Sequence, residues 1–336
     1  MNPAPVAAPS HPLVVIGASF GGVEALTALV AALPKDFPAF LAVVQHVGTQ
    51  PSVLPELLSR AGPLRAVHPH HDEPLRLGRI YVAPPDQHLL VTPRTVLLSR
   101  GPRENHTRPA IDPLFRTAAL HWGRRVTGVV LTGELDDGTA GLAAIKACGG
   151  CTVVQDPQEA IAPSMPSSAL ANVKVDHCVL LPAIAPLLSR LVAPPPPVAA
   201  PGPPPDALLR EQSVFEGVEP MANLQAIGTP TQLTCPDCGG TLSEIESGRP
   251  LRYRCHTGHA YTARSLESAQ AERTDHALQA SFRALKEREQ LLRRLAGVCR
   301  SLGDDAQAEV GMLQAARVQE QAARLAELIA EGTGGA

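Results

Sequence analysis

A serine lies in a turn of small residues near the N-terminus, in VVIGASFGGVEAL, residues 14–26. An apolar run ends at Gly17, and an Ala- and Leu-rich helical pattern follows. Gly17, Ser19 and Gly21 match G-x-S-x-G, in which small residues let a nucleophilic serine occupy a strained strand-to-helix turn. The alternative is the dinucleotide pattern G-x-G-x-x-G, but Ser19 stands where its middle glycine must approach a pyrophosphate. Because either motif alone is weak, a structural or phosphate-binding turn stays open until other residues are considered.

A serine hydroxyl needs a base before it can act as a nucleophile. His46 directly follows the apolar run at 40–45, and Asp136 and Asp137 follow another run at 126–132. Because the carboxyl ends of neighbouring parallel strands line one crevice, these residues are expected to meet Ser19 there. They predict a Ser–His–Asp triad, in which one aspartate orients the imidazole. The other aspartate can cap the helix that follows.

A second set of residues has the spacing of metal ligands. Cys235 and Cys238 form a C-x-x-C pair, and Cys255 and His259 follow with three residues between them. Two such pairs suit tetrahedral coordination, and four protein ligands leave no open position for a substrate. The pattern therefore predicts a structural zinc ion. The alternative is a set of reduced cysteines without a metal.

The elements that must position these residues follow from the alternation of two patterns. Apolar runs at 13–17, 40–45, 79–83, 126–132 and 151–155 alternate with helical patterns at 21–32, 52–60, 111–121 and 138–148. This alternation predicts an α/β domain with a doubly wound, mostly parallel sheet. Residues 89–99 look like an inserted hairpin. A long stretch rich in Ala, Leu, Glu and Arg predicts one or two amphipathic helices near the C-terminus.

Composition divides the chain into four expected regions: a catalytic domain at 12–192, a Pro-rich linker at 193–230, a zinc-ribbon-like Cys/His patch at 231–262 and a helical tail at 263–331. Proline cannot donate a backbone hydrogen bond, so the linker is expected to be extended and to separate the two cores.

The charge and cysteine content narrow the class of protein. A net charge of −3 gives no reason to expect a nucleic-acid or anionic-membrane surface. No apolar run approaches the roughly 20 residues that span a bilayer, and the first residues do not resemble a signal peptide. Seven cysteines, an odd number, fit a cytoplasmic protein better than a secreted disulfide scaffold.

Six blocks, taken in order over residues 12–192, resemble the catalytic domain of the chemotaxis protein-glutamate methylesterases. The blocks are VVIGASFGGVEAL, VVQH, YVAPPDQHLL, HTRPAIDPLF, VVLTGELDDGTAGL and VVQDPQEAIAPSMPSSAL. The resemblance implies a serine hydrolase that removes methyl esters from glutamyl side chains on chemoreceptor helices, with glutamine deamidation as a second activity. It implies no cofactor for catalysis, and chemoreceptors or related helical signalling proteins as partners.

The same resemblance implies roles for individual residues. Ser19 is the nucleophile, His46 the general base and Asp137 the orienting carboxylate, and the backbone N–H of Glu134 is an oxyanion donor. Arg108 either holds an acidic surface of the substrate, orders the site or is merely solvated. Two departures stand out. Phe20 replaces the usual threonine, and the first expected strand begins at residue 13, so the family's phosphorylatable receiver domain is not expected ahead of it.

Two other functions compete with the esterase. The chain could be a non-catalytic interaction protein that uses its Cys/His patch and helical tail, although the intact triad argues against this. The patch could also be a nucleic-acid-binding zinc ribbon. Arg249, Arg252 and Arg254 lend that reading slight local support, but the overall charge does not.

Overall fold

The computed structural model describes residues 11–332 except 49, 194–202 and 247. The chain forms two compact units, Met1–Leu266 and Glu267–Ala336. Each unit is described by itself below.

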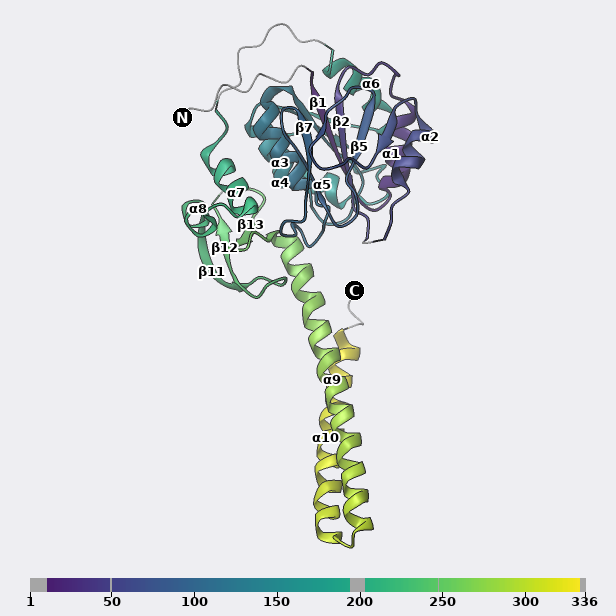
Figure 1. The fold of residues 1–336 in the computed structure, drawn as a ribbon, viewed down its shortest axis with the longest axis vertical. Coiled ribbons are helices and arrows are strands. Elements are labelled where there is room, and N and C mark those ends of the chain that lie inside the picture. The colour runs from purple at the N-terminus through teal and green to yellow at the C-terminus, as the bar shows by residue number, and fades with distance from the viewer. Residues whose placement is uncertain (1–10, 49, 194–202, 247, 333–336) are drawn as a thin grey trace. The chain divides into compact units, whose positions relative to one another are not determined.

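The centre of the first unit is a seven-stranded sheet with the strand order β10-β9-β8-β1-β2-β5-β3 (Figure 1). Every neighbouring pair in it is parallel. Its strands are β1 (Leu13–Ala18), β2 (Phe40–Gln45), β3 (Arg65–Val67), β5 (Arg79–Val82), β8 (Val126–Val130), β9 (Cys151–Gln155) and β10 (His177–Val179). The expected parallel α/β sheet is confirmed.

Helices cover both faces of this sheet, because residues along each strand alternate between the two faces. Val14 and Ile16 of β1 pack under one set of helices, α1 (Gly22–Ala31), α2 (Leu54–Ala61) and α6 (Leu181–Leu191). Leu13 and Val15 pack under the other set, α3 (Ile111–Trp122), α4 (Thr139–Ala147) and α5 (Ser164–Asn172). A short 3-10 helix, Gly123–Arg125, links α3 to β8.

The predicted hairpin is present. β6 (His88–Val91) and β7 (Thr95–Ser99) pair antiparallel, and the two-residue strand β4 (Glu73–Pro74) extends them into a small sheet.

The region expected to be a linker contains two helices, α7 (Asp206–Glu216) and α8 (Pro220–Ile227). Residues 194–202, which hold most of the proline tract, lie outside the described residues. After α8 comes a four-stranded antiparallel sheet of β11 (Gly228–Thr234), β12 (Thr241–Ile245), β13 (Arg252–Cys255) and β14 (Ala260–Thr262). We call residues 228–262 the ribbon. The ribbon belongs to the same compact unit as the parallel sheet. Its strand β12 shares a small apolar cluster with α7 and α8, separate from the apolar clusters of the parallel sheet.

The C-terminal unit is a helical hairpin. α9 (Ala263–Ser301) enters it from the first unit, and α10 (Asp305–Gly332) runs back beside α9 (Figure 1). Arg293 of α9 donates a hydrogen bond to Gln319 of α10. No helix among the described residues is long and apolar enough to cross a membrane.

Candidate active site and metal-ligand cluster

Ser19 lies at the tight turn between β1 and α1. Its backbone N–H donates to the carbonyl of Thr132, 2.9 Å away, which fixes the turn beside the loop after β8. Gly21 has a φ of +74°, a conformation that costs glycine little. A Cβ on Gly17 would lie 2.4 Å from Cγ2 of Ile111. The two glycines of the G-x-S-x-G motif are therefore required, Gly21 by its positive φ and Gly17 by close packing.

Parallel pairing brings the expected triad together. Ala18 is level with Gln45, and Gly17 is level with Val130, so the loops after β1, β2 and β8 leave the same sheet edge. His46 Nδ1 lies 3.1 Å from Ser19 Oγ, and His46 Nε2 lies 2.7 Å from Asp137 Oδ2. A neutral imidazole with its proton on Nε2 can donate to Asp137 and accept the serine proton at Nδ1.

Asp137 is a buried carboxylate surrounded by hydrogen-bond donors. Besides His46 Nε2, the donors are the Ile111, Asp112 and Gly138 backbone N–H groups and the Asn105 side-chain amide. Burial alone would raise the pKa of Asp137, but hydrogen bonds from His46, Ile111 and Asn105 outweigh burial and lower it. This carboxylate therefore stays charged and can stabilise an imidazolium.

Two further polar residues of the site, Asn105 and Asp112, were not predicted from the sequence. The Asn105 amide nitrogen donates to Asp137 Oδ1 at 2.8 Å and to Asp112 Oδ2 at 2.9 Å. Burial, and then the charge of Asp137, raise the pKa of Asp112 well above its ordinary value. Asn105 lies in the loop before α3, and Asp112 lies in the first turn of that helix. No sequence motif marked either residue as part of the site.

Asp136 does not cap α4. The N-cap of that helix is Gly138, with no side-chain hydrogen bond. Asp136 Oδ1 instead accepts a hydrogen bond of 2.6 Å from the Thr262 hydroxyl of the ribbon. Burial raises the pKa of Asp136. The two neighbouring aspartates thus have different partners, and His46 contacts Asp137.

Arg108, whose role was open, orders the surrounding loops. Its guanidinium pairs with Asp86 at 2.7 Å and donates to the carbonyls of Arg100 and Gly101. Glu134 is exposed beside the site, and its carboxylate accepts a hydrogen bond from Ser164. Its role as an oxyanion donor stays a prediction.

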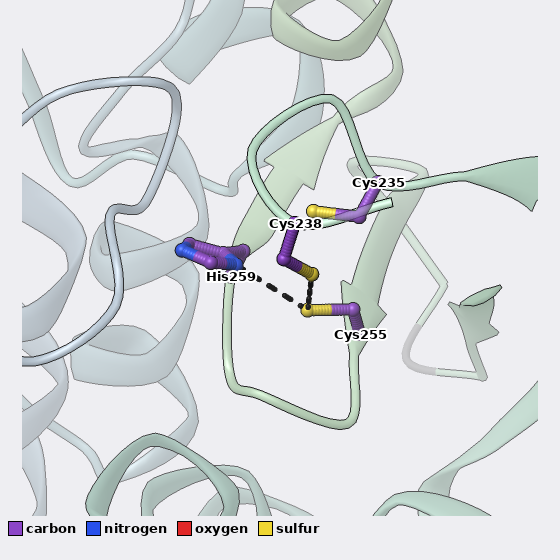
Figure 2. A group of neighbouring side chains, drawn as sticks. All are labelled: Cys235, Cys238, Cys255 and His259. Carbon is purple, nitrogen blue, oxygen red and sulfur yellow. Dashed lines mark hydrogen bonds between the residues drawn. The ribbon is translucent and has the colours of Figure 1, made fainter. Parts of the chain in front are cut away.

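The four expected metal ligands lie in the ribbon and converge (Figure 2). The ligand atoms of Cys235, Cys238, Cys255 and His259 all lie within 4.8 Å of one another. Cys255 Sγ is 3.7 Å from Cys238 Sγ and 3.5 Å from His259 Nδ1. This group could bind a metal ion.

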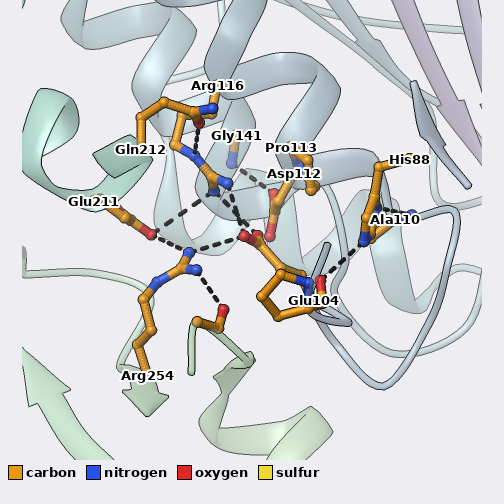
Figure 3. A network of polar contacts seen from close by, with 12 residues as sticks. His88, Glu104, Ala110, Asp112, Pro113, Arg116, Gly141, Glu211, Gln212 and Arg254 are labelled. Atoms are coloured by element: carbon orange, nitrogen blue, oxygen red, sulfur yellow. Dashed lines mark hydrogen bonds and ion pairs between the residues drawn. The ribbon is translucent and has the colours of Figure 1, made fainter. Parts of the chain in front are cut away.

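A buried charged cluster joins the ribbon and α7 to α3 (Figure 3). Arg116 of α3 forms a two-pronged ion pair with Glu104, at 2.7 and 3.0 Å. Arg254 of β13 contacts both Glu104, at 3.0 Å, and Glu211 of α7, at 2.8 Å. Burial alone would raise the pKa of Glu211, but Arg252, Arg254 and Arg116 lower it.

This cluster bears on the nucleic-acid reading of the ribbon. Arg252 is paired with Glu211 at 2.6 Å, and only 1% of the Arg254 side chain is exposed. Two of the three arginines that supported that reading are therefore committed to carboxylates within the protein.

Comparison with known proteins gives a consistent match. The family model described as CheB methylesterase matches residues 14–188. A protein of Leptospira interrogans is 38% identical over 184 residues, which cover 54% of this chain and 95% of the relative. Protein-glutamate methylesterase/protein-glutamine glutaminase 2 of Anaeromyxobacter dehalogenans is 39% identical over 189 residues, 56% of this chain and 55% of the relative.

A solved structure gives the same match. The crystal structure of the Thermotoga maritima CheB methylesterase catalytic domain aligns with a TM-score of 0.52 and 31% sequence identity. The alignment covers 55% of this chain and all of that one.

Proposed function

Because this chain belongs to the CheB methylesterase family, we propose that it is a protein-glutamate methylesterase that uses Ser19, His46 and Asp137. The observation that carries the proposal is the continuous hydrogen-bonded chain from Ser19 Oγ through His46 to Asp137 Oδ2, at 3.1 and 2.7 Å. A non-catalytic interaction protein would have no need of this alignment.

The proposed reaction is a two-step acyl transfer. Ser19 Oγ attacks the carbonyl carbon of the glutamyl methyl ester while His46 Nδ1 takes the hydroxyl proton. The Glu134 backbone N–H stabilises the tetrahedral oxyanion. Methanol leaves with the proton from Nδ1, and an acyl-enzyme remains. Water, deprotonated by the same nitrogen, then releases glutamate. Attack on a glutamine side chain releases ammonia by the same steps.

Exposed apolar side chains beside the nucleophile support a protein substrate. Phe20 is 63% exposed and Ile161 is 60% exposed. Ile161 lies against Gly21, where an added Cβ would come within 2.7 Å of it. A helix that carries a methylated glutamate could cover both side chains. Chemoreceptors, or related helical signalling proteins in the cytoplasm, are therefore the proposed substrates.

Removal of the nucleophile tests the activity. Ser19→Ala is expected to lower methanol release from a methylated receptor fragment by about 10⁴-fold or more, because the triad acts as a unit. The same change should abolish labelling by a fluorophosphonate probe. Ser213→Ala, at a half-buried serine on α7, is the matched control. Activity of Ser19→Ala within tenfold of wild type would refute the assignment.

The Cys/His cluster supports a second proposal, a structural zinc ion. Two Cys→Ser substitutions test it: Cys238→Ser alters the cluster, whereas Cys178→Ser alters an exposed cysteine on β10. Wild type and Cys178→Ser should each carry about one zinc per chain, and Cys238→Ser should carry much less. Well under one equivalent in reduced wild-type protein would refute a zinc site.

A further inference from the structure

The catalytic carboxylate is linked to one loop residue that lies outside the triad. Asn105 is 5% exposed, and both hydrogens of its side-chain amide are used, one toward Asp137 and one toward Asp112. A single amide thus bridges two buried carboxyl groups. If the amide group flipped by half a turn, Asn105 Oδ1 would face the two carboxyl groups, and an acceptor would face an acceptor at each of them.

The other end of this amide is held by the ribbon and the start of α9. Asn105 Oδ1 accepts hydrogen bonds from the Thr262 backbone N–H, at 3.1 Å, and from the Ser265 hydroxyl, at 3.0 Å. The Asn105 backbone N–H also donates to the Ala260 carbonyl at 2.7 Å. Thr262 and Ser265 bond each other reciprocally across the N-terminus of α9, as in a capping box. The oxygen end of the amide is therefore fixed by residues 260–265.

These holding residues are continuous with the metal-ligand loop. β13 ends at Cys255, β14 begins at Ala260 directly after His259, and the two strands pair. Arg254 donates to the carbonyl of Gly258 at 2.8 Å. It also reaches Glu104, the neighbour of Asn105 in the chain. Two routes thus run from the ligand loop to Asn105, one through β14 and one through Arg254.

We propose that the ribbon braces the catalytic site: metal held at the Cys/His cluster fixes β13 and β14, and Asn105 is the positioning residue that transmits this constraint to Asp137. The inference rests on the proposed function and on the proposed metal. Its physical basis is that a buried polar network orients its members only when every partner is in place. A misplacement of about 1 Å at a reacting group can cost 10²-fold in rate.

The test compares full-length variants that affect the two ends of this path. Asn105→Ala removes the bridge, Ser265→Ala removes one of its two holding donors, and Cys238→Ser removes a ligand. Asn223→Ala and Cys178→Ser are matched controls outside the path. For each we would measure zinc per chain, kcat and KM for a small methyl ester, and the rate of Ser19 labelling by a fluorophosphonate. Stripping zinc from wild type with a chelator and adding it back avoids reliance on one ligand variant.

Zinc removal and Asn105→Ala are each expected to lower kcat by about 10- to 100-fold with little change in KM, because the disturbed group acts on the reacting atoms. Asn105→Ala and Ser265→Ala should keep their zinc, with a smaller loss for Ser265→Ala. Removing zinc from Asn105→Ala should cost less than threefold more, since the path is already broken. Full multiplication of the two losses, or undiminished kcat in zinc-free wild type, would overturn the proposal.

Hydrogen exchange separates this proposal from the proposed function. The Ile111 and Gly138 amides donate to Asp137, so their exchange should accelerate when zinc is removed. This readout needs no ester hydrolysis. If the wild type neither hydrolyses the ester nor is labelled at Ser19, the proposed function fails. Hydrogen exchange at the two amides still tests whether the ribbon holds Asp137 in place. Unchanged exchange at both amides would refute the brace even in an active esterase.

Discussion

At the scale of single residues, two adjacent aspartates differ only in their surroundings. Asp137 accepts from His46 and four other donors, whereas Asp136 accepts from Thr262. Asp137→Asn would turn an amide N–H toward these donors and disturb the imidazole tautomer. We expect kcat to fall by about 10⁴-fold, as for other triad carboxylates. Asp136→Asn keeps an oxygen for Thr262 and should lose less than tenfold. Equal losses in ester hydrolysis would contradict the assignment of Asp137.

His88 makes stability depend on pH. It is fully buried, its Nε2 bonds the Pro102 carbonyl and its Nδ1 accepts from the Ala110 N–H. Burial lowers the pKa of His88 from 6.5 to about 4. Below pH 6.5 the unfolded chain therefore binds a proton that the folded chain does not, so stability falls as pH falls. The His88 contribution should drop by about 2 kcal/mol between pH 7 and pH 5.

Urea unfolding followed by the fluorescence of Trp122, the single tryptophan, measures this drop. His88→Gln can supply the same donor and acceptor without titrating. The pH dependence of its unfolding free energy should be smaller than that of wild type by about 2 kcal/mol over the same range. The same dependence in both proteins would mean that other groups cause it.

The meeting of Ser19, His46 and Asp137 could be predicted from sequence because each follows an apolar strand, and these strands end at the same sheet edge. Asn105 and Asp112 could not. Asn105 contacts Asp137 in the loop after β8 and Thr262 in the ribbon, 32 and 157 residues away in the chain. Asp112 contacts Asp137, 25 residues away. No pattern within the segment ENHTRPAID indicates these long-range contacts. Arg108 shows the same limit, since its partner Asp86 lies 22 residues away.

At the scale of elements, the charged cluster fixes α7 and the ribbon to α3. Glu211→Gln would leave the buried Arg254 and the nearby Arg252 with less carboxylate charge. Removing one partner of a buried ion pair costs about 3–5 kcal/mol, so the unfolding free energy should fall by about that amount. Glu219→Gln, in the turn between α7 and α8, is the control and should change it by less than about 0.5 kcal/mol. A loss below about 1 kcal/mol for Glu211→Gln would show that the cluster does not hold these elements.

Elements with a clear period were predictable, and short or context-dependent ones were not. The five long central strands and α1 to α4 follow their sequence patterns closely. β3 and β10 have three residues each, too few for a period to show. α7 and α8 lie in a stretch assigned to a linker because prolines surround it. Side chains of these helices such as Phe215 and Leu224 are buried by contacts within the folded unit, which the local sequence does not indicate.

At the scale of the whole molecule, the C-terminal unit carries an apolar seam that its own hairpin does not cover. Ala296 of α9 is buried within the hairpin. Leu291, Leu295 and Val298 of α9 are between 51% and 59% exposed, and Leu302, in the turn directly after α9, is 79% exposed. Their spacing of four, three and four residues is typical of the seam of a coiled coil. Such a seam suits another helix, and the proposed substrates are helical.

We therefore expect the double change Leu291→Glu and Leu295→Glu to raise the apparent KM for a methylated helical receptor fragment by about tenfold or more. Loss of two leucine contacts exceeds the 1.4 kcal/mol that a tenfold change requires. Hydrolysis of a small methyl ester should stay unchanged, because no triad residue is altered. Leu328→Glu, another exposed leucine on α10, is the control. Equal losses on both substrates would mean that the seam stabilises the fold. Unchanged hydrolysis of both, with a shift from dimer to monomer in sedimentation, would mean that the seam joins two copies of this chain.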